Sequence, residues 1–232
     1  SNYDLQKEEA LVVSMMSWRP AAIILSNTVH TERTNNILRQ ADVPVIEIMR
    51  LADDPVDINI GIDQRRAARA LAEHVISKGY RRFGFLGRNE GDITGVDRFL
   101  EIESVILEHG LTVLPPKHYK TPPNFLRGKL GLEDMLSDTP RPEAVFFPND
   151  TTALGGMVHC IENNISIPDD IALAGFSGLA IAQNMPMKLT TIETRRFETG
   201  QRAAIEILNC LAGRTGNKCV DMGFELLSGQ TT

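Results

Sequence analysis

Short, almost unbroken apolar runs recur along this chain, and segments with helical spacing separate them. The runs lie at residues 21–25, 43–48, 58–62, 83–86, 144–147 and 171–174. They lack the polar alternation of a strand that is covered on one face only. Such continuous apolarity is typical of parallel strands that are covered by helices on both faces. The sequence therefore predicts a buried parallel sheet.

The segments between these runs place apolar residues on one helical face. The predicted helices lie at residues 4–18, 63–79, 99–110, 151–161 and 197–213. Gly79, Gly110 and Gly213 stand at their expected ends, where glycine commonly terminates a helix. Asp150 is the expected N-cap of the fourth helix. Alternating strands and helices of this kind predict a doubly wound α/β fold.

Charge and cysteine content exclude several classes of protein. The net charge of −6 argues against a nucleic-acid grip within these residues, because phosphate binding needs clustered Lys and Arg. The three cysteines, Cys160, Cys210 and Cys219, show neither a disulfide framework nor zinc-ligand spacing, and they fit a reducing cytoplasm. No apolar run approaches the roughly 18 residues of a membrane helix. We therefore expect a cytoplasmic protein without a membrane segment.

The chain also lacks the common motifs of nucleotide binding and nucleophilic catalysis. Neither a G-x-x-x-x-G-K-[ST] loop nor a G-x-G-x-x-G turn is present. The sequence around Ser177 is similar to a nucleophile elbow, but Leu179 stands where that motif needs glycine. No histidine follows His159 to act as the base. We expect no catalytic residue, no metal and no cofactor.

The final third of the chain combines several short motifs in one order. They are FPND at 147–150, ALGG at 153–156, PDDIALAGF at 168–176 and LTTI at 189–192. At these spacings they resemble the effector-binding core of the LacI/GalR family of bacterial transcription regulators. The closing DMGFELLSG at 221–229 is most similar to the gluconate-utilisation repressors of that family. The resemblance covers almost the whole chain.

The resemblance implies two doubly wound, parallel-sheet lobes of the periplasmic-binding-protein type, with the effector between them. The expected N-terminal lobe is 1–81 plus 193–216, and the C-terminal lobe is 82–192 plus 217–232. The three crossovers are expected near Arg81, Thr191 and Gly216. The first strand–helix–strand segment of the N-terminal lobe and a helix-turn-helix headpiece are expected to be missing from this sequence.

Three effector-binding residues follow from the resemblance with a physical reason for each. Arg98 matches the arginine of an R-x-x-G-[FYW] motif, although Glu101 replaces the glycine. Asn149 matches the ligand-contacting amide of the family, which can donate and accept. Ser177 stands where sugar-binding members usually carry Asp. Because a buried carboxylate would repel an anion, serine there favours an acidic sugar such as gluconate or a phosphorylated relative.

Weaker candidates come from position alone. Arg66, Ser26, Thr194 and Phe125 are the further expected effector contacts, with Arg66 adding positive charge and Phe125 stacking on a sugar ring. A surface role is an equally good interpretation of Arg66, and a core role is an equally good interpretation of Phe125. Leu154 and Met185 fall where family members make dimer contacts, and each fits an internal core as well.

The sequence thus predicts the effector-sensing and dimerisation region of a transcription regulator, a repressor that responds to a sugar acid or sugar. Its expected partners are a small-molecule effector, a second copy of the chain, and operator DNA through the headpiece. The alternative is a periplasmic sugar-binding protein of a transport system, which shares the two-lobed architecture. A sugar-metabolising enzyme comes third.

Overall fold

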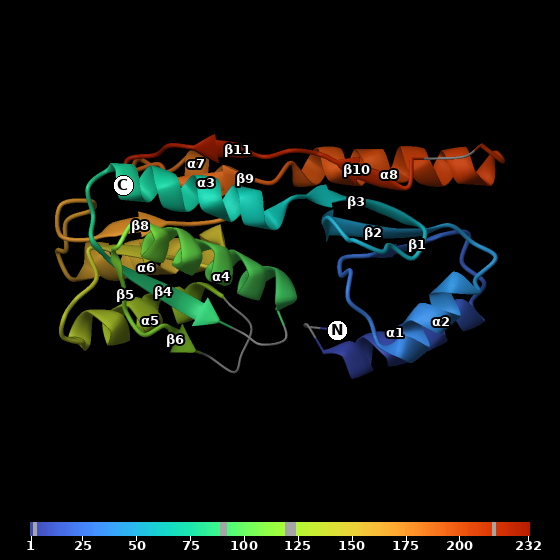
Figure 1. The fold of residues 1–232 in the computed structure, drawn as a ribbon, viewed down its shortest axis with the longest axis horizontal. Coiled ribbons are helices and arrows are strands. Elements are labelled where there is room, and N and C mark those ends of the chain that lie inside the picture. The colour runs from blue at the N-terminus through green and yellow to red at the C-terminus, as the bar shows by residue number, and fades with distance from the viewer. Residues whose placement is uncertain (2–3, 89–91, 119–123, 215–216) are drawn as a thin grey trace. The chain divides into compact units, whose positions relative to one another are not determined.

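A computed structural model of the chain describes residues 1, 4–88, 92–118, 124–214 and 217–232. The chain forms two compact units, each made of two segments (Figure 1). The first unit is Ser1–Asp63 with Arg195–Gly223, and the second is Gln64–Thr194 with Phe224–Thr232. Each unit contains its own sheet.

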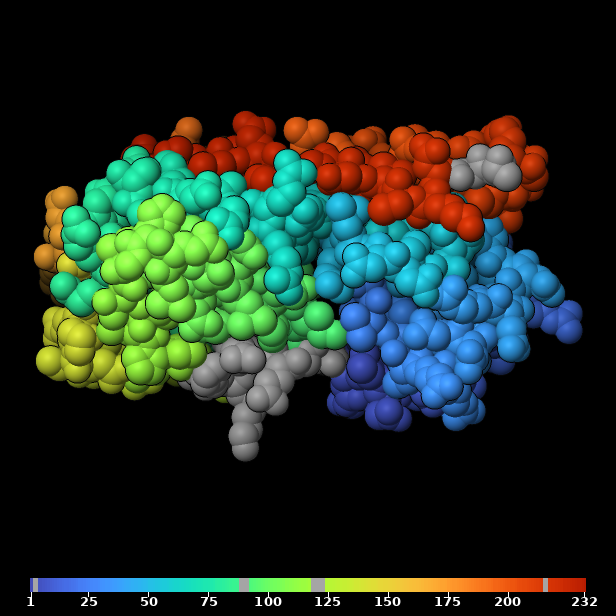
Figure 2. Space-filling model, viewed as in Figure 1, coloured from blue at the N-terminus to red at the C-terminus, as the bar shows by residue number. Residues whose placement is uncertain are grey.

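The first unit contains a parallel four-stranded sheet with helices on both faces. Its strands follow the order β1 (Ile23–Leu25), β2 (Val45–Arg50), β3 (Ile58–Ile62) and β10 (Cys219–Asp221). Its helices are α1 (Leu5–Ser17), α2 (Glu32–Arg39) and α8 (Arg196–Leu211). Figure 2 shows α1 and α2, the blue segments of this unit, together at the surface.

Both faces of this sheet are apolar, as the sequence predicts. Val12 of α1 and Leu38 of α2 pack with Ile23 and Val45 on one face. On the opposite face Ile46, Ile58 and Ile60 pack against Ala203 of α8. Every residue of β3 is buried, which explains its continuous apolar run.

The second unit is built around a second parallel sheet. Its order is β5 (Thr112–Val113), β4 (Arg82–Arg88), β7 (Ala144–Phe146) and β8 (Ala172–Ala174), and β6 (Lys117–His118) also pairs with β4. A short antiparallel pair joins β9 (Thr191–Glu193) to β11 (Glu225–Leu227). The helices are α3 (Gln64–Ser77), α4 (Ile93–Glu108), α5 (Phe125–Ser137), α6 (Asp150–Glu162) and α7 (Ala180–Gln183).

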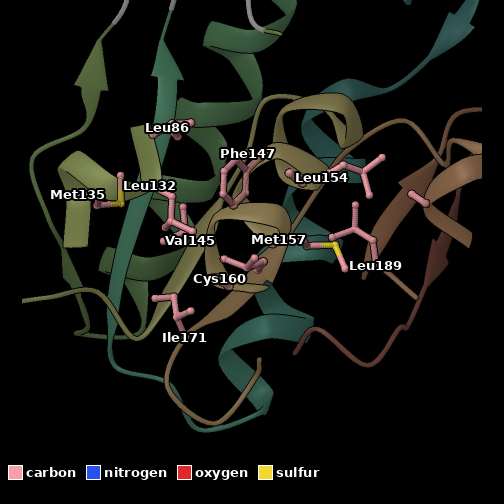
Figure 3. Packing of buried hydrophobic residues seen from close by; sticks show 13 residues of the cluster. Leu86, Leu132, Met135, Val145, Phe147, Leu154, Met157, Cys160, Ile171 and Leu189 are labelled. Carbon is pink, nitrogen blue, oxygen red and sulfur yellow. The ribbon is translucent and has the colours of Figure 1, made fainter. Parts of the chain in front are cut away.

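The core of the second unit surrounds α6 (Figure 3). Val145 of β7, Met157 and Cys160 of α6 and Leu189 before β9 all belong to one buried cluster. Within the same unit α3 packs against α4, and α5 packs against α6. This core holds the carboxyl ends of β7 and β8 in fixed positions.

The six predicted strands are confirmed as β1, β2, β3, β4, β7 and β8, and the five predicted helices as α1, α3, α4, α6 and α8. Among the described helices, sequence patterning missed α2 and α5, whose apolar faces are short, and the four-residue helix α7. The boundaries of the two compact units differ from those of the expected lobes, which were 1–81 plus 193–216 and 82–192 plus 217–232. The helix α3 belongs to the second unit because it packs against α4. The crossover expected near Gly216 lies outside the described residues.

Candidate functional site

Arg98 lies on α4, and two of its hydrogen bonds go to neutral groups of the second unit. Its Nε donates to Gln64 Oε1 at 2.8 Å, and its Nη1 donates to the carbonyl oxygen of Pro148 at 3.1 Å. The guanidinium carbon lies 3.9 Å from the ring centroid of Phe176. A guanidinium over an aromatic face gains a cation–π attraction and keeps its charge. Arg98 is therefore an oriented, half-buried cation.

Asn149 caps the helix that follows β7. Its Oδ1 accepts from the backbone N–H of Thr152 at 2.9 Å and from the Thr152 hydroxyl at 2.8 Å. The expectation that Asp150 is the N-cap was wrong, because Asp150 is already the first helical residue. The Asn149 Nδ2 group has no hydrogen-bond acceptor among the described residues. Its oxygen thus serves the fold, and its amide donor can serve a ligand.

Asp150 instead braces the loop that carries Ser177. It is fully buried, and its two carboxylate oxygens accept from the Leu179 N–H and from the Thr191 hydroxyl, each at 2.6 Å. The Asp150 N–H donates to the carbonyl oxygen of Phe176 at 3.0 Å. A buried carboxylate with several donors is a rigid support. Sequence reasoning treated Asp150 only as a cap, and no local pattern signals this longer-range role.

Ser177 lies three residues after the end of β8 and has an unusual backbone conformation. Its φ angle is 137°, in a region that favours glycine. The Ser177 N–H donates to the carbonyl oxygen of Ile192 at 2.9 Å, and the Ser177 carbonyl oxygen accepts from the Thr194 hydroxyl at 3.3 Å. The Ser177 hydroxyl has no hydrogen-bond partner within the described part of the chain. Strained residues with an unused polar group are common at ligand sites.

Four predicted residues come together in this way. Arg98 hydrogen-bonds the residue before Asn149 and stacks on the residue before Ser177, and Thr194 contacts Ser177 directly. All four belong to the second unit: Asn149, Ser177 and Thr194 follow β7, β8 and β9, and the side chain of Arg98 reaches them from α4. Ligands of doubly wound sheets bind at the carboxyl ends of the strands. Gln64, which orients Arg98 from α3, was not predicted, because a helical glutamine carries no sequence signal.

The remaining candidates lie in other parts of the chain. Arg66 is exposed in the first turn of α3, and Phe125 begins α5 with 42% of its surface exposed. Ser26 is exposed directly after β1 in the first unit. That Arg66, Phe125 and Ser26 contact the effector therefore stays a prediction.

The two expected dimer residues lie in the core of the second unit. Leu154 is 6% exposed and belongs to the cluster of Figure 3, and Met185 packs against that cluster. Their role in a dimer stays a prediction. In the described segments no three His, Cys, Asp or Glu residues are grouped so that they could hold a metal ion. None of the described helices has the length and apolarity needed to cross a bilayer.

Comparison with known proteins shows which family this chain is similar to. The family described as a periplasmic binding protein-like domain matches residues 72–232. The HTH-type transcriptional regulator IdnR of Escherichia coli is 32% identical, over 99% of this chain and 69% of the relative. A solved LacI-family transcriptional regulator from Silicibacter pomeroyi is also 32% identical, with a TM-score of 0.93 over 99% of this chain and 70% of that one.

The chain belongs to the LacI family of transcriptional regulators. The solved transcription regulator GntR from Chromobacterium violaceum is similar as well, with 28% identity and a TM-score of 0.89 over 99% of this chain and 84% of that one. These relatives are regulators rather than enzymes, and they do not favour the alternative of a periplasmic transport protein. In this LacI-family chain the group around Arg98 lies near the carboxyl ends of β7 and β8.

Proposed function

We propose that this LacI-family chain senses a sugar acid such as gluconate, in the cytoplasm and without catalysis, as the effector-binding and dimerisation region of a repressor. The observation that supports it is the group formed by Arg98, Asn149 and Ser177 at the carboxyl ends of β7 and β8. It combines an oriented cation, an amide donor and a hydroxyl. These groups suit a polyhydroxylated anion.

The residue at position 177 supports an acidic ligand over a neutral one. The resemblance implies that sugar-binding members of the family usually carry Asp at the position where this chain carries Ser177. A carboxylate in this partly buried position would repel an anion, and the effective dielectric there strengthens such repulsion. The resemblance of residues 221–229 to gluconate-utilisation repressors agrees with the same ligand class.

Calorimetric titration tests the ligand class. We expect gluconate or 6-phosphogluconate to bind more tightly than glucose or galactose. Each should also raise the melting temperature of the folded chain, by an amount that grows with the logarithm of ligand concentration over Kd. Tighter binding of the neutral hexoses would reject the proposal. Ser177→Asp is the matched variant, and it should shift the preference toward the neutral sugars.

The remaining parts of the proposal concern partners. We propose a homodimer with Leu154 and Met185 near the interface, which reads a two-fold symmetric operator through a helix-turn-helix headpiece. Sedimentation of the chain at micromolar concentration checks the dimer. A monomer at all concentrations would remove Leu154 and Met185 from the interface.

A further inference from the structure

Glu101 lies on α4, three residues after Arg98, at the position where the resemblance implies a glycine. Its side chain is only 15% exposed, and its Oε1 accepts from Arg69 Nε at 2.7 Å. Arg69 belongs to the neighbouring helix α3. A glycine at position 101 could make no such contact. The departure from the motif is therefore matched by a charged partner on the adjacent helix.

Arg69 also holds a second part of α4. Its Nη1 and Nη2 donate to the two carboxylate oxygens of Glu108 at 2.9 and 3.0 Å, and the Ser104 hydroxyl donates to Glu108 Oε1 at 3.0 Å. A guanidinium that binds a carboxylate through two parallel N–H groups has a fixed orientation. Glu101 and Glu108 are about two helical turns apart. One arginine of α3 therefore sets the position of α3 along α4.

The same two helices meet at Arg98. Gln64, the first residue of α3, is 3% exposed and accepts from Arg98 Nε at 2.8 Å. Arg65 Nη2 donates to Asp97 Oδ1 at 3.0 Å. Further along, α3 packs against α4 through Arg69 (Figure 1). Because residue numbers rise in the same direction along both helices at these contacts, a displacement of one helix along the other would separate Gln64 from Arg98.

We propose that Arg69 and Glu101 form a positioning pair, which holds α3 and α4 in the register at which Gln64 orients Arg98. The inference rests on the proposed function, in which Arg98 binds an anionic effector, and it adds two residues that do not touch the ligand. A hydrogen bond from a guanidinium to a carboxylate depends on the direction of the donors. A support that is loose by about 1 Å therefore weakens ligand binding.

Calorimetric titration with gluconate tests the pair through a double-mutant cycle. We expect Arg69→Met and Glu101→Ala each to weaken gluconate binding about three- to tenfold, because either change breaks the contact between the helices. The variant with both changes should bind about as weakly as the weaker single variant, since the second change finds no contact left to break. A double variant whose loss equals the product of the two single losses would overturn the pair, and so would undiminished binding by all three variants.

Arg82→Met is the matched control. Arg82 pairs with Glu143 of the same unit at 2.8 Å, and its side chain is 44% exposed, compared with 38% for Arg69. Because this ion pair includes no residue of α3 or α4, its loss should leave gluconate affinity unchanged.

A conservative variant covers the case in which Arg69→Met or Glu101→Ala does not fold, as judged by circular dichroism. Lysine keeps the charge of Arg69, but it lacks the planar fork that binds two carboxylates. Arg69→Lys should therefore weaken gluconate binding about two- to fivefold. Unchanged binding by this variant would overturn the proposal.

A spectroscopic measurement separates the positioning pair from the ligand. In the ligand-free chain the Nε–H proton of Arg98 is hydrogen-bonded to Gln64, and its NMR signal can be assigned by its disappearance in Arg98→Lys. Exchange of this proton with water should be at least about fivefold faster in Glu101→Ala than in the unmodified chain, and it should be unchanged in Arg82→Met.

The two measurements distinguish failure of the ligand class from failure of the pair. If the unmodified chain binds no sugar acid but Glu101→Ala speeds the exchange, the proposed ligand class is wrong and the positioning of Arg98 stands. If the chain binds gluconate and neither the affinity nor the exchange responds to Glu101→Ala, only the positioning pair is overturned.

Discussion

At the scale of single residues, Asn149 combines a structural and a ligand-facing role. Its oxygen caps α6, and its Nδ2 is directed to no acceptor among the described residues. Asparagine and aspartate are nearly equal as helix caps, but aspartate has no donor and carries a negative charge. The two roles can therefore be separated by substitution.

We expect Asn149→Asp to change the free energy of unfolding by less than about 0.5 kcal/mol, because the helix cap is kept. The same variant should weaken gluconate binding at least tenfold, because a carboxylate with the same charge as the ligand replaces the amide donor. Asn149→Ala should cost about 1 kcal/mol of stability. Urea denaturation and calorimetry measure the two effects. Undiminished gluconate binding by Asn149→Asp would confine Asn149 to capping.

Ser177 shows the same tension between stability and function. Its φ of 137° suits glycine, but glycine has no hydroxyl. Ser177→Gly should raise the free energy of unfolding by up to about 1 kcal/mol, because relief of strain exceeds the entropy cost of glycine. The same variant should bind gluconate several-fold more weakly. Ser177→Ala, which keeps the strain and loses the hydroxyl, should lower affinity without the gain in stability.

At the scale of elements, two glycines set the distance between α5 and α6. A Cβ at Gly128 of α5 would overlap the Thr152 carbonyl oxygen, and one at Gly155 of α6 would overlap the Phe125 carbonyl oxygen. Each helix therefore contacts the backbone of the other. Since Asn149 precedes α6 and Phe125 begins α5, this contact also positions two candidate residues.

Alanine at either position should force the helices apart. We expect Gly128→Ala to lower the free energy of unfolding by about 1–3 kcal/mol, which is typical of overpacking. Gly200→Ala in α8 is the control, because a Cβ there meets no atom within 4 Å. It should stabilise the chain by about 0.5–1 kcal/mol. Equal effects of the two variants in thermal unfolding would argue against a close helix contact.

At the scale of the whole molecule, a buried ionic cluster links stability to pH. His30 lies between Glu8 of α1 and Glu47 of β2, and Glu47 also accepts from the Val56 N–H at 2.7 Å. Burial alone lowers the pKa of His30, but the hydrogen bonds and charges of Glu47 and Glu8 outweigh it and raise the pKa to about 9. The imidazolium therefore joins three segments of the first unit at neutral pH.

Because the pKa of His30 is higher in the folded chain than in the unfolded chain, its protonation stabilises the fold. This stabilisation is fully present at pH values below the unfolded pKa of 6.5, and it is lost as the pH rises to about 9. The free energy of unfolding should fall by on the order of 2–3 kcal/mol across this range. In His30→Gln the corresponding fall should be absent. Urea denaturation from pH 6 to 10 measures both curves, and parallel curves would contradict the ionic cluster.

Much of the architecture could be predicted from the order of residues. Fully buried strands such as β3 need apolar residues on both faces, and this requirement is visible in sequence without any partner being known. The helix α5 was missed because its buried face consists largely of Gly128 and Gly131, with Leu132 and Met135. Glycines pack through their backbone and leave no apolar period to detect.

Part of the candidate site could also be predicted, because some of its residues have a local signal in the sequence. Arg98, Asn149, Ser177 and Thr194 follow strands or lie in recognisable motifs, and the fold brings them together. The supports of these residues could not be found, because Asp150 contacts Thr191, 41 residues away, through a single hydrogen bond.

The sequence by itself determined the fold class, the strand and helix order and the family, since these depend on local periodicity and on motifs at fixed spacing. The tertiary structure alone decided which polar residues brace others, where the backbone is strained, and that α3 belongs with α4. Those features depend on contacts between residues distant in the chain, and such contacts exist only once the hydrophobic cores have formed.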